Sequence, residues 1–290
     1  MLERLNLSSK PRSFWIAISI LAILAVILVI VFYQYAPIGV DWEETYTDAA
    51  RKWLDPYEDS TFTNPPWALL FLPHAFLDLR LGNAINLVLN FGVLMLVMRK
   101  FGGDVWALLL VFTSPFMLDL ARTNNIDWLP ALALLVPPTW GILLLSVKPQ
   151  TIGAVALIWW KERNFTPRIL VPTLIVTGLS FVIYGFWVTR VAGLPPQAGA
   201  WNIAPFPFGI PIGLYLIYVA YRAKDADDGV IFAAIGTAFV TPYIAPYSLN
   251  TAMALGGSKY RREAFIVWIA AWIFVIYTAR RQEVEAMFGG

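Results

Sequence analysis

Two ionisable side chains, Asp41 and Lys148, stand where long apolar runs end. Asp41 follows the first such run, and Lys148 lies between two later ones. A carboxylate at the mouth of a membrane cavity can take a proton from a hydroxyl, and partial desolvation raises its pKa toward a useful range. A lysine near the lipid headgroups could hold a phosphate as a point charge. The plain alternatives are a solvated loop acid and a lysine that snorkels from a helix end.

Two further polar segments interrupt the apolar runs. Residues 122–128 include Asn125 and Asp127, which could either line a cavity or satisfy the ends of broken helices. Tyr243 and Tyr247 each follow a proline in a later break. Tyrosines at such a place commonly form an interfacial belt, but they could also contact a sugar or a lipid phosphate. The pattern leaves these alternatives open.

The composition excludes several classes of site. The chain has no cysteine, which excludes disulfides, thiolate metal sites and cysteine nucleophiles. Its single histidine, His74, argues against a histidine-rich metal centre or a Ser-His-Asp triad and is expected to pack in the core. There is no glycine-rich phosphate loop. A net charge of +2 is too small to indicate nucleic acid. We therefore expect no metal, no cofactor and no nucleic-acid partner.

The elements that must position these residues are predicted to be membrane helices. Of 290 residues, 59% are hydrophobic and 14% are charged, whereas a soluble domain carries roughly 25% charged residues. The first apolar run covers residues 14–35, which is long enough to span a bilayer, and no small-x-small cleavage site follows it. We predict an all-α, multi-pass protein of the cell membrane, with one transmembrane domain over residues 1–290.

About nine or ten membrane segments are expected. Several are shorter than the roughly 20 residues of a straight crossing, and prolines interrupt many of them. Broken helices at membrane depth persist only where protein or a watery cavity satisfies the backbone, so an internal cavity is expected. After the first helix, the predicted segments are 67–78, 81–98, 105–118, 128–147, 151–160, 169–188, 210–221, 230–243 and 264–277, with a half-span at 249–255.

The basic residues predict an orientation. Arg4, Lys10 and Arg12 precede the first helix, which places the N-terminus in the cytoplasm. The acid-rich segment 37–66 is then an external loop, with a short amphipathic helix over 47–54 and Trp53 at the interface. Simple alternation of the segments puts Arg99-Lys100 on the external side, against the usual preference.

The order of these motifs resembles that of glycosyltransferase family 87, in the GT-C superfamily of membrane sugar transferases. The likeness covers residues 14–256. It departs from the family at Asn64, which replaces the tyrosine of a Tyr-Pro-Pro motif, at residues 124–127, where a Gly-Gln-x-Asn motif is expected, and at Ser248, which replaces an acid. The matching motifs are Asp41, Tyr46, Ala49-Ala50, Asp55-Pro56-Tyr57, Asn64-Pro65-Pro66, Lys148-Pro149, Pro242-Tyr243 and Tyr247.

This resemblance implies a GT-C fold and an inverting transfer of a sugar, a mannose-like hexose or a pentose. The donor would be a polyprenyl-phosphate-linked sugar and the acceptor an external lipid or glycan hydroxyl. Asp41 would be the general base, and Lys148 would bind the donor phosphate. Glu43 and Glu44 are reserve candidates for the base. Arg51 and Lys52 are expected to attract the phosphate. The residues expected to line the cavity are Tyr46, Gln150, Asn125, Asp127, Tyr243 and Tyr247.

Two other functions fit the same features. Broken helices and an intramembrane lysine also suit a transporter or lipid flippase, although no inverted repeat is visible. The chain is short for the family, which would suit a non-catalytic membrane subunit assembled with other chains. An enzyme should bring Asp41 and Lys148 to one cavity accessible to lipid. A carrier needs a site with access from both sides, and a structural subunit needs no cavity.

Overall fold

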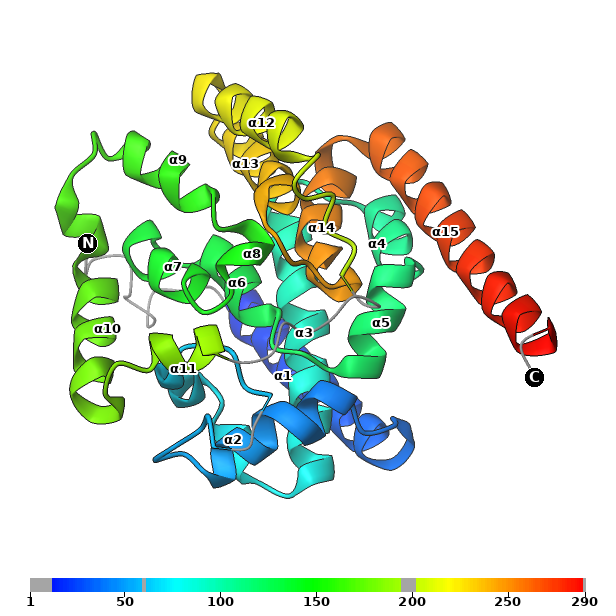
Figure 1. Cartoon of the computed structure of the whole chain (residues 1–290), viewed down its shortest axis with the longest axis horizontal. Helices are drawn as coiled ribbons and strands as arrows, with labels where there is room; N and C mark the ends of the chain where they lie inside the picture. Colours follow the sequence, from blue (N-terminus) through cyan, green and yellow to red (C-terminus); the bar gives the residue numbers. More distant parts are fainter. Residues whose placement is uncertain (1–11, 59–60, 194–201, 289–290) are drawn as a thin grey trace.

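The computed structural model describes residues 12–58, 61–193 and 202–288, and these residues form helices and no strands (Figure 1). The predicted all-α class is therefore confirmed for this part of the chain. The π-helix is η3, and the other η elements are 3-10 helices. The elements are α1 (Arg12–Tyr35), η3 (Trp42–Thr47), α2 (Asp48–Arg51), η4 (Pro66–Phe71), η5 (Pro73–Phe76), α3 (Leu79–Lys100), α4 (Val105–Phe112), α5 (Pro115–Thr123), α6 (Trp128–Leu132), η6 (Ala133–Leu135), α7 (Pro138–Leu145), α8 (Pro149–Ile152), α9 (Val155–Glu162), η7 (Pro167–Leu170), α10 (Val171–Tyr184), α11 (Val188–Gly193), α12 (Ile210–Arg222), α13 (Ala226–Val240), η9 (Pro246–Leu249), α14 (Asn250–Lys259) and α15 (Arg261–Phe288).

Three helical stretches among the described residues are long and apolar enough to cross a membrane, and they indicate a membrane protein. They cover Ile18–Tyr35, Leu79–Lys100 and Pro167–Tyr184. A fourth crossing exists if α4 and α5, which meet at a 59° bend, count as one. The expected count of nine or ten crossings stays a prediction.

Prolines shorten several of the segments that were expected to be single spans. The segment 67–78 folds as the 3-10 helices η4 and η5, which contain six and four residues and are too short to cross a bilayer. The segment 128–147 divides into α6, η6 and α7, and Pro138 begins α7. These breaks agree with the expected interruption of the segments by prolines, because a proline cannot donate the hydrogen bond that continues a helix through it.

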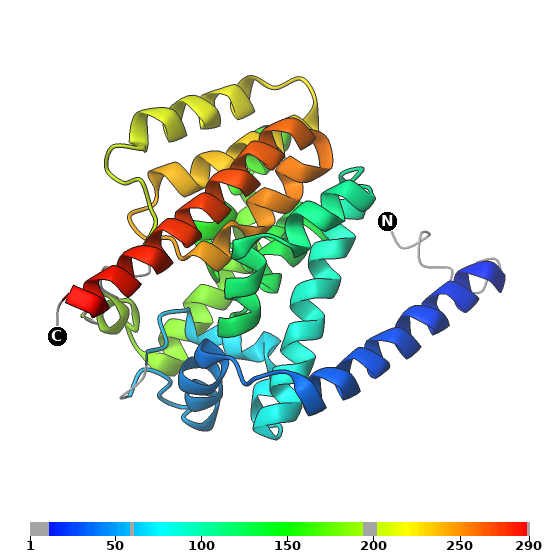
Figure 2. The same cartoon turned by 90° about the vertical axis from the view of Figure 1, so that its right-hand side faces the viewer.

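The helical bundle has two ends, and α3 runs from one to the other (Figure 2). Asp78 caps the first turn of α3 by accepting bonds from the N–H groups of Arg80 and Leu81, and the helix ends at Lys100. At that second end, ion pairs join three turns that are far apart in the sequence: Arg261 binds Asp104 at 2.9 Å, and Lys259 binds Asp225 at 2.9 Å and Asp228 at 2.8 Å.

The basic residues that end α3 lie at the second end of the bundle. Arg99-Lys100 belongs to the same end as Asp225 and Lys259, opposite the end at which α3 begins. The side of the membrane on which this end lies stays a prediction. The basic residues near 100, 222–224 and 259–262 therefore gather at one end of the molecule.

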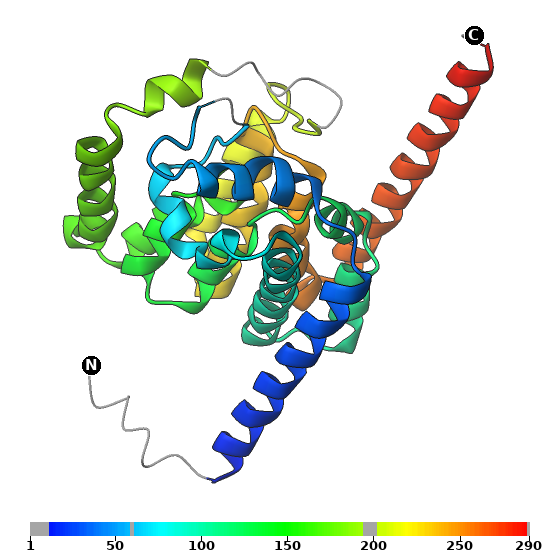
Figure 3. The same cartoon turned by 90° about the horizontal axis from the view of Figure 1, so that it is seen from below.

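The two terminal helices extend away from the helical body on different sides (Figures 2 and 3). Within α1, none of the stretch Ile18–Tyr35 is buried, although Phe32 touches Phe91 of α3 edge to face. Large apolar side chains along the described part of α15, such as Ile273 and Tyr277, are also exposed. Surfaces of this kind suit contact with lipid, which requires no polar cover.

Candidate functional site

A stripe of buried asparagines on α3 supports the site. Asn83, Asn86 and Asn90 follow a spacing of three and four residues, which places them on one face of the helix. All three are at most 2% exposed. A buried amide is costly unless its hydrogen bonds are made, so a polar partner must pack against this face. That partner is the segment 123–128, which follows α5.

The asparagines bind the backbone of this segment as well as its side chains. Asn86 Nδ2 donates to the carbonyl oxygens of Asn124 and Asn125, at 2.8 and 3.2 Å. Asn90 Nδ2 donates to the carbonyl of Asn125 at 2.6 Å, and Asn90 Oδ1 accepts from the N–H of Trp128 at 3.0 Å. Asn124 ends α5 with a φ of 51°, a left-handed conformation that asparagine tolerates. The irregular segment is therefore held from one side by a regular helix.

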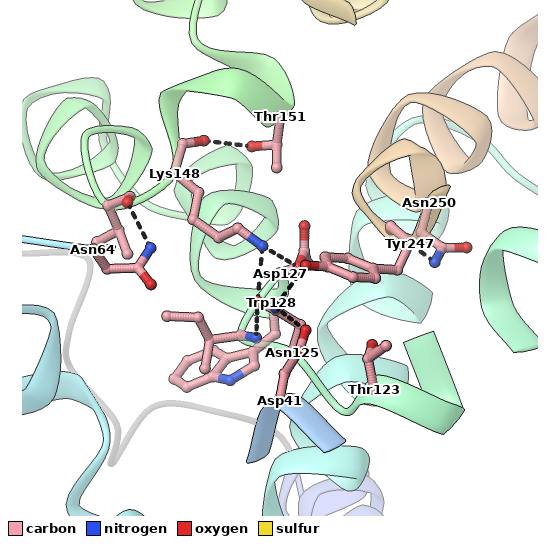
Figure 4. Close-up of polar contacts among 12 residues, drawn as sticks. Asp41, Asn64, Thr123, Asn125, Asp127, Trp128, Lys148, Thr151, Tyr247 and Asn250 are labelled. Carbon is pink, nitrogen blue, oxygen red and sulfur yellow. Dashed lines mark hydrogen bonds and ion pairs between the residues drawn. The ribbon is translucent and has the colours of Figure 1, made fainter. Parts of the chain in front are cut away.

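The side chain of Asn125 is the point where the candidate residues meet (Figure 4). Asn125 Nδ2 donates to Asp41 Oδ2 at 2.6 Å and to the Tyr247 hydroxyl at 2.9 Å. Asn125 Oδ1 accepts from the Tyr46 hydroxyl at 2.6 Å and from Lys148 Nζ at 2.7 Å. Four residues that lie up to 206 positions apart, from 41 to 247, thus share one amide.

Lys148 is a buried cation with a buried counter-ion. Its Nζ lies 2.6 Å from Asp127 Oδ2, and the two side chains are 5% and 4% exposed. The ammonium also lies 4.8 Å from the centre of the Tyr247 ring, a distance at which a cation is attracted to the ring face. A buried charge is tolerated when it is paired and hydrogen-bonded in this way. Lys148 therefore faces Asn125 and Asp127 rather than open solvent.

Asp41 lies in a less buried position than Lys148. Burial raises the pKa of the Asp41 carboxyl, while the hydrogen bond from Asn125 and the charge of Lys148 oppose that rise. Burial, together with the charge of Asp41, raises the pKa of Tyr247, so this tyrosine keeps its proton and can donate it in a hydrogen bond to Asp41. The carboxylate is thus desolvated in part but has two fixed donors.

The turn before η3 brings Asp41 to this place. Gly39 lies so close to the end of α5 that a Cβ there would stand 2.3 Å from Asn124 Cβ. Its N–H donates to Asn83 Oδ1 at 2.9 Å. After Asp41, the π-helix η3 buries Trp42 and Tyr46, and the Trp42 ring stacks on His74 with 5.0 Å between ring centres. His74 accordingly packs in the core, as predicted.

A polar cavity of about 410 Å³ opens beside Asp41. Its wall includes Arg122, and Arg122 Nη2 lies 2.8 Å from Asp119 Oδ1. Lys148 does not belong to the wall. The lining residues are Val40, Asp41, Glu44, Thr45, Thr61, Asp119, Arg122, Thr123, Tyr243, Ala245, Pro246 and Tyr247. We call this space the polar cavity. Hydroxyl-bearing ligands suit such a wall, since carboxylates accept hydrogen bonds from hydroxyls.

A larger apolar cleft of about 680 Å³ lies on the other side of the segment 244–249. Helices α12, α13, α14 and α15 form most of its wall, and Glu263 is its one lining carboxylate. Ile244 and Leu249 face this cleft, whereas Ala245 and Tyr247, in the same segment, line the polar cavity. One short segment therefore separates an apolar space from a polar one.

The structure brings together most of the predicted site residues. Asp41, Tyr46, Asn125, Asp127, Lys148 and Tyr247 are joined by the contacts above, and Glu44 and Tyr243 line the polar cavity. Four others lie apart from these contacts. Glu43 and Arg51 are exposed, Lys52 pairs with Asp48 at 3.3 Å, and Gln150 is half-buried in α8 and does not line either cavity.

The prediction missed the asparagine stripe and Asp119. The spacing of residues 83, 86 and 90 in a helix of otherwise apolar character was the available signal. Within the described residues, no group of three or more His, Cys, Asp or Glu side chains is arranged to hold a metal ion. No family profile, curated protein or solved structure matches this chain.

Proposed function

We propose that this protein is an inverting membrane glycosyltransferase of the GT-C type, with Asp41 as the general base. The observation that carries the proposal is the position of Asp41, whose carboxylate lines a polar cavity while Asn125 and Tyr247 hold it. A base must be within reach of the proton that it takes, and it benefits from a pKa raised toward the working pH. Burial supplies that rise here.

The proposed reaction is a single displacement. The acceptor hydroxyl gives its proton to the Asp41 carboxylate, and its oxygen forms a bond to the anomeric carbon of the donor sugar. The bond between that carbon and the phosphate oxygen breaks, and its electron pair leaves with the polyprenyl phosphate. Because attack and departure occur on opposite faces, the configuration at the anomeric carbon inverts. The sugar would be a mannose-like hexose or a pentose.

Two cations are candidates for stabilising the departing phosphate. A fixed positive charge near the oxygen on which charge accumulates lowers the barrier. Lys148, which was predicted for this role, lies behind Asn125 and is paired with Asp127. Arg122 lines the cavity itself, and an exposed guanidinium suits a phosphate group. We propose that Arg122 contacts the phosphate directly and that Lys148 adds its field from behind.

The apolar cleft supports a lipid-linked donor. An isoprenoid chain needs an apolar surface, while its sugar phosphate needs polar groups within a few bonds of the chain. The cleft and the polar cavity share the segment 244–249 as a wall, which suits a substrate with both parts. In this proposal the N-terminus is cytoplasmic, the chain is multi-pass, and Asp41 lies on the external side. The acceptor is an external lipid or glycan.

Proteoliposomes that contain the purified chain and a radiolabelled polyprenyl-phosphate sugar test this proposal. An enzyme makes a labelled product in which the sugar is bound to an added acceptor. A carrier moves the intact donor across the bilayer and makes no such product, and a structural subunit does neither. Product from the wild-type chain and none from Asp41→Asn would support the proposal.

Two matched variants sharpen the same experiment. Glu43→Gln removes an exposed carboxylate two residues away and should keep the wild-type rate. Arg122→Met should raise the donor concentration needed for half-maximal rate, and Arg122→Lys should restore part of that loss. Equal rates for Asp41→Asn and Glu43→Gln would exclude Asp41 as the base.

A further inference from the structure

The amide of Asn125 has only one orientation that satisfies its neighbours. Its oxygen accepts from Lys148 Nζ and from the backbone N–H of Ile126, each at 2.7 Å. An ammonium and a backbone N–H can only donate, so the amide oxygen must face them. The amide nitrogen must then face the opposite side, where it meets Asp41 and Tyr247. The rotation of this side chain is therefore set by the groups behind it.

Burial and hydrogen bonds to the neighbouring backbone hold the ion pair behind Asn125 in place. Lys148 Nζ lies 2.6 Å from Asp127 Oδ2, and both side chains are buried. Asparagines of α3 fix the backbone around Asp127, since Asn90 binds the carbonyl of Asn125 and the N–H of Trp128. A cation on the amide oxygen also polarises the amide, which strengthens the bond that its N–H makes to a carboxylate.

We infer that Asn125 is a positioning residue for Asp41, and that Lys148 and Asp127 act on Asp41 through it. The amide holds one carboxylate oxygen at 2.6 Å and stabilises the ionised form in a partly desolvated place. The inference deepens the proposed function, because it names the group that keeps the base ionised. It does not depend on transfer activity, since the ionisation of Asp41 can be measured directly.

Several charged or titratable groups face Asp41 and must be considered together. Within the described part of the chain, Tyr46 and Glu44 approach from η3, Asp127 and Lys148 from behind Asn125, Asp119 and Arg122 from α5, Tyr247 from η9, and Tyr243 from the segment before η9. Among these neighbours, Asn125 donates directly to Asp41 Oδ2 at 2.6 Å, and Tyr247 is the second donor. Removing the amide donor should therefore change the ionisation of Asp41 more than removing any one of the more distant charges.

Infrared titration of the carboxyl groups in the purified chain measures this change. The difference between wild type and Asp41→Asn identifies the Asp41 signal. Asn125→Leu keeps the shape of the side chain and removes both its donor and acceptor. Asn125→Asp keeps an oxygen for Tyr46, Lys148 and Ile126 to bind and is the second variant if Asn125→Leu does not fold. A hydrogen bond to a charged group corresponds to a midpoint shift of about 1 to 2 pH units.

We expect both variants to raise the midpoint of Asp41 titration by about 1 to 2 pH units. The acidic limb of the transfer rate against pH should move upward by the same amount. Asn202→Asp is the matched control, because within the described residues Asn202 bonds to backbone groups of residues 204, 242 and 244, and it should leave the midpoint in place. A folded Asn125 variant with the wild-type midpoint would overturn the inference. A shifted midpoint without any transfer by the wild-type chain would refute the proposed function and leave this inference intact.

Discussion

Replacing the buried Lys148 with methionine should destabilise the protein far more than replacing a lysine of a surface ion pair would. The change leaves the Asp127 carboxylate buried without its counter-ion, and Asp127 Oδ1 already has no hydrogen-bond partner among the described residues. Removing one member of a buried pair costs about 3–5 kcal/mol, which is a large part of a stability of about 5–15 kcal/mol. The wild-type pair itself need not add that much, because desolvation opposes the attraction.

The double variant Lys148→Met/Asp127→Asn separates these two effects. It removes both charges, so the buried uncompensated carboxylate disappears and only hydrogen bonds are lost. We expect it to be more stable than Lys148→Met by about 2 kcal/mol, within the range of about 0.5–3 kcal/mol for the coupling of residues in contact. The half-exposed pair Lys52–Asp48 is the matched control, and removing Lys52 should cost about 0.3–0.5 kcal/mol.

Reversible unfolding in mixed micelles, followed by tryptophan fluorescence, gives the four free energies that this cycle needs. The chain carries 13 tryptophans, and Trp128 lies next to the ion pair. A loss of less than 1 kcal/mol for Lys148→Met would refute the reasoning, as would a double variant whose loss equals the sum of the two single losses.

Two further predictions concern the packing around the site. Burial raises the native pKa of Asp41 above its ordinary 3.8, so the native state binds a proton more readily than the unfolded state. The free energy of unfolding of the wild type should therefore fall as the pH rises from about 4 through the native pKa. The free energy of unfolding of Asp41→Asn, measured over the same pH range, should not show this fall. A difference in the free energy of unfolding between wild type and Asp41→Asn that stays constant with pH would contradict a raised pKa for Asp41. Gly82→Ala should lower the melting temperature, because a Cβ there would stand 2.4 Å from the carbonyl oxygen of His74 and 2.8 Å from the ring of Trp42. Gly92 lies on the same helix, and a Cβ there would meet nothing within 4 Å, so Gly92→Ala should stabilise the protein by roughly 0.5–1 kcal/mol. Equal effects of Gly82→Ala and Gly92→Ala on the melting temperature would contradict this difference in packing.

Much of the site could be predicted because charge is rare in this chain. Asp41 and Lys148 stand out against long apolar runs, and a charged group in such a place needs a partner or a purpose. The partner itself was harder to identify. Nothing in the residue types says that Lys148 binds Asp127 and Asn125, which lie 21 and 23 positions earlier, rather than a phosphate. Whether Lys148 binds these residues or a phosphate depends on how deeply the irregular segment 123–128 is buried in the bundle.

The all-α class could be predicted from the sequence, but the lengths of the individual helices could not. Apolar runs identify helices with little ambiguity when the whole chain is apolar, yet they do not show where a helix breaks. Pro66, Pro73 and Pro138 each begin a new helix, so one apolar run becomes two or three short elements. Hydrophobicity records burial from water, and it does not distinguish a helix facing lipid from one packed inside the protein.

In the proposed reaction, the Asp41 carboxylate takes the proton of the acceptor hydroxyl. The most direct measurement is the ratio of the sugar-transfer rates of wild type and Asp41→Asn, at saturating polyprenyl-phosphate sugar and at a pH where Asp41 is ionised. We expect the variant to fold, to bind the donor and to be slower by about 100-fold or more, the usual contribution of a positioned base. A folded, donor-binding variant that transfers sugar at the wild-type rate would contradict it.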